Sequence, residues 1–111
     1  MTVNELIESG IFNTVNVGYG TGRTVTKPFA CDLLSLALVK AVSGSAWFTV
    51  IGNVNTIAVS VHTDCSCIVL CEGVNLDNNA YRKAKEHGVT VLRTDLPVFD
   101  AALELSTMIA Q

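Results

Sequence analysis

The chain has 111 residues and a formal net charge of −3, with 50% hydrophobic and 15% charged residues. This length suits a single domain, and the apolar content excludes a disordered chain. The acidic balance argues against nucleic acid as a partner and against a basic membrane-binding surface.

The N-terminal third combines short helical and extended patterns. Asn4–Ser9 predicts a short helix that ends at Gly10, because glycine adopts the left-handed conformation of a helix C-cap without strain. Alternation of apolar and polar residues over Phe12–Val17 predicts a half-buried strand. A second short strand is expected over Thr24–Phe29, ended by Pro28, whose missing N–H group marks the edge of a sheet.

A very apolar helix is expected next. Asp32 is a suitable N-cap for a helix over Leu33–Val42, which stops at Ser43–Ser45. Only Ser35 and Lys40 give this helix a polar face. A helix that is apolar almost all round must be covered on several sides. We therefore expect the sheet to cover one side and a second copy of the chain, in a homodimer, to cover another.

Two continuously apolar segments, Ala46–Ile51 and Cys67–Cys71, predict strands that are buried on both faces. The segment Val54–Val61 between them fits either of two structures. Its alternation suits a strand, whereas its apolar residues at i, i+3, i+4 and i+7, after Asn53 as a cap, suit a helix. We choose the helix, because two parallel strands need a crossover between them.

The next helix and strand have clear limits. Asp77 is the expected cap of a helix over Asn78–His87, with Gly88 as its stop and Val89–Arg93 as the following strand. The inner stripe of that helix is expected to carry residues of small or aromatic type, namely Ala80, Tyr81 and Ala84.

The closing segment predicts a helix from Asp95 to about Ala110, with Thr94 as its N-cap and Pro97 in its first turn. The residues that recur along it at helical spacing are Phe99, Ala102, Leu103, Ser106 and Ile109. The order from Ala46 onward is thus β-α-β-α-β-α. This order predicts a single α/β domain with a mainly parallel sheet, after an irregular β-containing N-terminal third.

Four cysteines occur, three of them close together in the chain: Cys31, Cys65, Cys67 and Cys71. Their spacing differs from the paired C-x₂₋₄-C units of zinc sites and from the C-x₂-C repeats of iron–sulfur proteins. Cys67 and Cys71 share one side of a strand, where thiols pack as hydrophobic groups. We expect core packing and no cofactor; a cysteine-dependent redox or metal-binding role, with Cys65 as its candidate, is the alternative.

Two regions are candidates for ligand binding. The loop Gly18–Arg23 suits either a plain glycine turn or an anion held by backbone N–H groups and the Arg23 charge, although it matches no Walker A or dinucleotide motif. Ligands of open parallel sheets also gather at the carboxyl ends of strands. Together, the candidate residues are Gly20, Gly22, Arg23, Asn53, Asn55, Glu72, Gly73, Arg93 and Thr94.

No residues are assigned to catalysis or to a metal. His62 and His87 have only sequence neighbours as carboxylate partners, and His87 suits the C-terminal end of its helix, where a cation complements exposed carbonyl groups. The start of the chain is acidic where a signal peptide is basic, and no stretch approaches the roughly 18 apolar residues of a membrane helix. We therefore expect a cytoplasmic protein without a membrane segment.

Several segments together resemble a known family. They are Ala30–Ser35, Ala46–Val50, Asn55–Val59, Ile68–Gly73 and Val91–Thr94. In combination they resemble the small stand-alone DRTGG-domain proteins, similar to the N-terminal domain of HPr kinase/phosphorylase. The namesake motif is altered at Thr21–Thr26, which lacks the acidic residue before the arginine and the later glycine.

The resemblance implies a dimeric α/β module with an accessory or regulatory role, separate from any domain that carries phosphate chemistry. We therefore expect a non-catalytic regulatory module that forms a homodimer and senses a small anionic metabolite or nucleotide. A larger metabolic or redox enzyme is a further expected partner.

Overall fold

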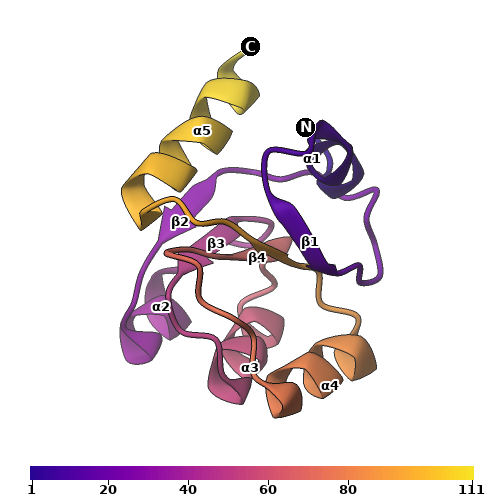
Figure 1. Cartoon of the computed structure of the whole chain (residues 1–111), viewed down its shortest axis with the longest axis vertical. Coiled ribbons are helices and arrows are strands. Elements are labelled where there is room, and N and C mark those ends of the chain that lie inside the picture. Colours follow the sequence, from indigo (N-terminus) through magenta and orange to yellow (C-terminus); the bar gives the residue numbers. More distant parts are fainter.

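The computed structural model describes all 111 residues, which form five helices and five strands (Figure 1). The helices are α1 (Val3–Ser9), α2 (Leu34–Lys40), α3 (Val54–His62), α4 (Asn78–His87) and α5 (Val98–Ala110). The strands are β1 (Asn13–Asn16), β2 (Pro28–Ala30), β3 (Ala46–Thr49), β4 (Cys67–Leu70) and β5 (Val91–Arg93). None of the five helices combines the length and the apolar character needed to span a bilayer.

The strands form one sheet in the order β1-β5-β4-β3-β2. Strands β2 to β5 are parallel, and β1 pairs antiparallel with β5, with a register shift between Thr14 and Asn16. Each crossover from β2 to β5 moves to the next strand in the same direction, and crossovers of one hand then place their helices on one face. The predicted α/β fold with a mainly parallel sheet is confirmed.

Both faces of the sheet are covered by helices. Figure 1 shows α2, α3 and α4 below the sheet and α1 and α5 above it. Neighbouring residues of one strand enter opposite cores: Trp47 packs with the α2–α4 side, whereas Phe48 packs with the α1–α5 side. This alternation follows from the two-residue period of a strand. It explains why β3 and β4 read as continuously apolar segments, since every residue in both strands is buried.

The ambiguous segment after β3 is helical, as predicted. The Asn53 side chain accepts hydrogen bonds from the backbone N–H groups of Asn55 at 2.9 Å and Thr56 at 3.4 Å. These bonds satisfy donors that the first helical turn leaves free. Ile57 is buried against the sheet. The cap and the crossover requirement therefore outweigh the β-branched content of α3.

Two predicted caps are wrong. Leu33 occupies the N-cap position of α2, and the Asp32 carboxylate instead accepts hydrogen bonds from Thr49 Oγ1 and the Val50 backbone N–H, both at 2.9 Å. Pro97 occupies the N-cap position of α5, which begins at Val98. Thr94 is buried beside β4, where its N–H donates to the carbonyl of Leu70 at 2.8 Å. The Asp32 side chain and the Thr94 backbone N–H thus form hydrogen bonds with distant parts of the chain instead of capping a helix.

The second predicted strand is displaced toward the C-terminus. Thr24 forms only an isolated bridge with Thr2, and Pro28 begins β2 instead of ending a strand. Proline is tolerated at the first residue of a strand because no ladder hydrogen bond to its nitrogen is needed there. The edge position is confirmed, because β2 is the last strand in the sheet order.

Helical spacing alone does not identify the buried face of α5, although Ala102 and Ile109 do pack against the core. Ala101 and Leu105 are its buried residues, whereas Phe99 is 73% and Leu103 is 53% exposed. Apolar residues occur on two sides of this helix, and spacing alone gives no reason to prefer either side. In α4, Ala80 and Ala84 are buried as predicted, but Tyr81 is exposed.

Candidate functional site

The predicted ligand-binding residues lie at opposite ends of the parallel strands. Gly20, Gly22 and Arg23 lie near the end where β4 begins, since Arg23 contacts Asp64 before that strand. The other candidates lie at or after the carboxyl ends of β3, β4 and β5, and are Asn53, Asn55, Glu72, Gly73, Arg93 and Thr94. The structure therefore does not unite the nine residues in one site.

Arg93 fastens the loop that follows β4. Its Nε donates to the carbonyl oxygen of Val74 at 3.2 Å, and its Nη2 donates to that of Gly73 at 2.7 Å. Asp95 lies 3.8 Å from the same guanidinium. Glu72 and Gly73 both have positive φ, which makes the sharp turn that these carbonyl contacts stabilise. None of the six candidates at this edge lines any of the three cavities in the molecule.

Arg23 is likewise engaged in a structural contact. Its guanidinium meets both carboxylate oxygens of Asp64, with Nη1 to Oδ1 at 2.9 Å and Nη2 to Oδ2 at 3.1 Å. The Ser43 hydroxyl donates to the same carboxylate. These hydrogen bonds, first from Arg23 and then from Ser43, lower the pKa of Asp64 below its ordinary value. A free anion at this loop would compete with Asp64 for the guanidinium.

This ion pair predicts a pH-dependent stability. Because the folded-state pKa of Asp64 is lowered, its contribution is present above the unfolded pKa and is lost as pH falls through the folded pKa. The carboxylate is 61% exposed, so we expect Asp64→Asn to lower the free energy of unfolding at pH 7 by less than about 1 kcal/mol. Asparagine is chosen because it tolerates the positive φ at this position.

Urea denaturation at neutral and at strongly acidic pH measures this effect. The difference between wild type and Asp64→Asn should vanish at a pH below the folded pKa, where the wild-type carboxyl is protonated. A difference that stays the same at both pH values would assign the effect to something other than the charge of Asp64.

The four cysteines are unpaired, and two of them lie in the core as predicted. Cys67 and Cys71 are buried on the α1–α5 side of the sheet, and this burial raises their pKa values to about 12 and about 11. Burial also raises the pKa of Cys65, whose Sγ lies 3.3 Å from Thr63 Oγ1. No three His, Cys, Asp or Glu side chains are close enough together to hold a metal ion.

Thiol alkylation tests this packing. Because the thiolate is the reactive form, Cys67 and Cys71 should resist iodoacetamide in the native protein at mildly alkaline pH, by at least about 100-fold relative to the unfolded chain. Mass spectrometry of peptides from native and guanidinium-treated samples gives both rates. Rapid native labelling of either residue would contradict the buried position and support the redox alternative.

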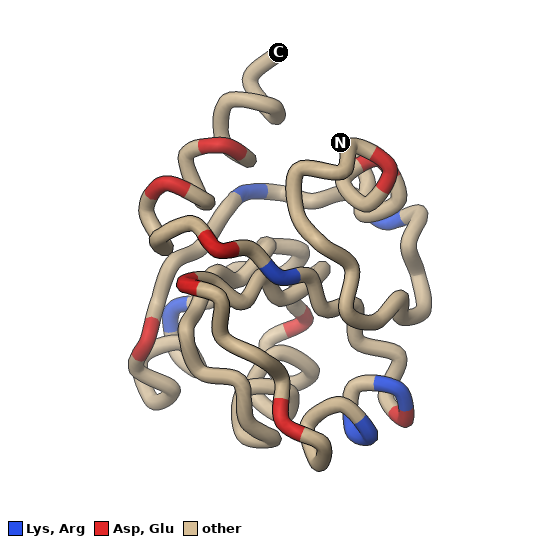
Figure 2. The backbone as a smooth tube through the Cα atoms, in the orientation of Figure 1, with Lys and Arg blue, Asp and Glu red and all other residues tan.

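An apolar surface surrounds α2 on the sides that face away from the sheet. Only Ala37 of this helix is buried. We define the α2 face as its exposed large hydrophobic residues, which are Leu33, Leu36, Leu38, Val39 and Val42, between 46% and 77% exposed. No residue from Leu33 to Val39 is charged (Figure 2). The apolar surface predicted from the sequence is therefore present, and nothing in the single chain covers the α2 face.

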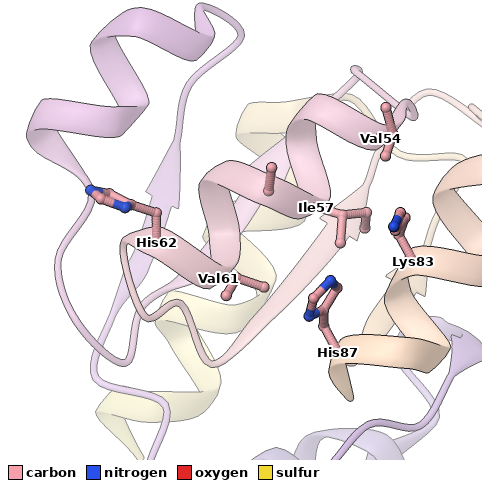
Figure 3. A pocket seen from close by; sticks show the side chains of 7 residues that line it. Val54, Ile57, Val61, His62, Lys83 and His87 are labelled. Atoms are coloured by element: carbon pink, nitrogen blue, oxygen red, sulfur yellow. The ribbon is translucent and has the colours of Figure 1, made fainter.

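A groove between α3 and α4 was not predicted. It has a volume of about 390 Å³ and is the largest cavity in the molecule (Figure 3). Its lining comes from two helices and consists of Val54, Ile57, Ala58, Val61, His62, Lys83 and His87. The sequence carried two signals for it: the apolar stripe of α3, and two basic residues of α4 at i and i+4, which share a helix face.

A scan against protein-family models finds no match to this chain, and a search of curated proteins finds no significant relative.

Proposed function

We propose that this protein is a non-catalytic regulatory module that forms a homodimer through the α2 face. The observation that carries the proposal is the exposure of that face, with Val39 at 77% and Leu33 at 60%. Large apolar patches on soluble proteins mark interaction surfaces, because covering them removes apolar area from water. The resemblance to dimeric DRTGG-domain proteins points to the same role.

A second copy is the occupant that the composition of the face favours. In a two-fold symmetric interface the same patch meets itself, so a charge near the axis meets a like charge. None of the five residues of the α2 face is charged, and Lys40 lies at the end of the helix. A partner of opposite charge would find nothing to pair with on this face.

The regulatory part of the proposal is the sensing of a small anionic metabolite or nucleotide, in the cytoplasm and beside a larger metabolic or redox enzyme. The non-catalytic role is supported by the way the candidate reactive groups are engaged within the chain. Arg23 and Arg93 are engaged in contacts within the chain, and the deeply buried thiols have raised pKa values. These arrangements suit a binding module better than a catalyst.

Sedimentation velocity of the wild-type protein at micromolar concentrations tests the dimer directly. We expect a species of twice the 11.8 kDa chain mass. A monomer at all concentrations would remove self-association through the α2 face from the proposal.

A further inference from the structure

The groove between α3 and α4 has the size of a small-molecule site. Its volume of about 390 Å³ lies within the range of about 300–1,000 Å³ that such sites occupy. The nine residues of α3 give it a length of about 13 Å at 1.5 Å per residue. This length suits a medium-chain organic molecule and is short for a bound peptide helix.

One wall of the groove is an apolar stripe on α3. Val54, Ile57, Ala58 and Val61 lie at successive i, i+3, i+4 and i+7 positions and all line the cavity. Ile57 is buried, but Ala58 and Val61 are exposed, with Val61 at 48%. Part of the stripe is therefore not covered by the sheet or by α4. Its uncovered part can bury the apolar portion of a ligand.

The other wall carries the positive charge of Lys83. Lys83 and His87 lie one turn apart on α4, and Figure 3 shows both side chains directed toward Ile57 across the groove. No carboxylate lines the cavity. His62 also borders it, but its ring lies on the opposite side of α3 from these two groups (Figure 3).

Lys83 is available to a ligand. Its only ion pair is with Glu86, at 3.3 Å, and both side chains are at least half exposed. Ion pairs of this exposed kind, three residues apart on a helix, contribute little. A ligand anion that is held beside an apolar wall can therefore displace Glu86 from the ammonium group.

We propose that this groove binds a small amphipathic anion, namely a medium-chain carboxylate. The alkyl chain packs along Val54, Ile57 and Val61, and the carboxylate accepts hydrogen bonds from Lys83 and His87. The inference rests on the proposed sensing function, and it gives that function a ligand class and a place that differs from the nine residues predicted from the sequence.

The test is a titration of the ¹⁵N-labelled full chain with octanoate, followed by amide chemical shifts. We expect saturable shifts in α3 and α4, and about tenfold weaker binding for Lys83→Gln, because charge-assisted hydrogen bonds are the stronger kind. Lys85→Gln is the matched control, because it removes a lysine from the same helix. The Lys85 ammonium lies over the Tyr81 ring at 5.3 Å, outside the groove lining. This control should bind as wild type does.

Further probes separate the two parts of the ligand. Ala58→Trp, at an exposed position, should fill the groove and abolish binding while the fold is kept. Octylammonium should not bind, and 1-octanol should bind more weakly than octanoate. Absent shifts, equal losses for both lysine variants or equal binding of 1-octanol would overturn the proposal.

Oligomeric state is recorded in the same samples. Shifts in α3 and α4 that follow protein concentration without octanoate would identify the groove as a contact between copies and would also overturn the proposal. A monomer that binds octanoate would contradict the α2 dimer alone. A dimer that ignores octanoate would contradict the ligand site alone.

Discussion

Gly18→Ala is expected to lower the free energy of unfolding by about 3 kcal/mol. A Cβ atom at this position would lie 1.9 Å from the carbonyl oxygen of Gly88 and 2.7 Å from the backbone nitrogen of Thr90. Both neighbours are held in place, because Gly88 accepts from the Tyr19 N–H at 2.8 Å and Thr90 accepts from the Gly18 N–H at 2.9 Å. The backbone cannot move aside without losing these hydrogen bonds.

Gly22→Ala is the matched control in the same loop. A Cβ at Gly22 would meet nothing within 4 Å, and this residue has no positive φ. Its free energy of unfolding should stay within about 0.5 kcal/mol of the wild type in urea denaturation. Equal stabilities of the two variants would show that the loop does not pack on Gly88 as described.

Val39→Asp is expected to raise the dissociation constant of the proposed dimer by at least about 100-fold. Val39 is the most exposed residue of the α2 face, at 77%, so the change removes little packing within one chain. In a two-fold dimer each substitution occurs twice, and two carboxylates without partners would be placed near the symmetry axis. Sedimentation velocity of both proteins gives the change in dissociation constant.

Val17→Asp controls for surface charge alone. Val17 is 57% exposed and follows β1, at the edge of the sheet opposite β2, whose chain leads into α2. Its dimer should dissociate as the wild type does. Val39→Asp should keep its circular dichroism spectrum and thermal midpoint as a monomer. An unchanged dissociation constant for Val39→Asp would place the interface away from α2.

The alternation of strands and helices was predictable because its signals are local. Apolar segments that alternate with capped amphipathic segments fix the class of fold and, through the crossover rule, the parallel sheet. The need for a crossover between two parallel strands distinguished helix from strand where periodicity fitted both, and the Asn53 cap agrees with it. Gly10 and Gly88 end their helices in the left-handed conformation, as glycine at these positions predicts.

Features that depend on distant residues were not predictable. Asp32 has the character of a cap, but Thr49 and Val50 lie close enough in the folded chain to use its carboxylate. In α5, the choice of Leu105 over Leu103 as a core residue depends on how the helix lies on the sheet. A single sequence contains no record of either relation.

The candidate binding residues show the same division. The two predicted regions exist, but only the three-dimensional arrangement places them at opposite ends of the strands and gives both arginines partners within the chain. The α3–α4 groove joins residues 20 or more positions apart, such as Ile57 and Lys83, and neither helix alone defines it. Its two halves were visible in the sequence as separate patterns without a relation between them.

The two outer strands disfavour the pairing of a further strand with the sheet. At one border the ladder starts with Pro28 in a strand of only three residues, and at the other the pairing of β1 slips between Thr14 and Asn16. Short, irregular or proline-bearing borders give an incoming backbone little to align with. Growth into a continuous intermolecular β-structure is thereby discouraged, and recognition between folded molecules is left to side chains on the helical layers.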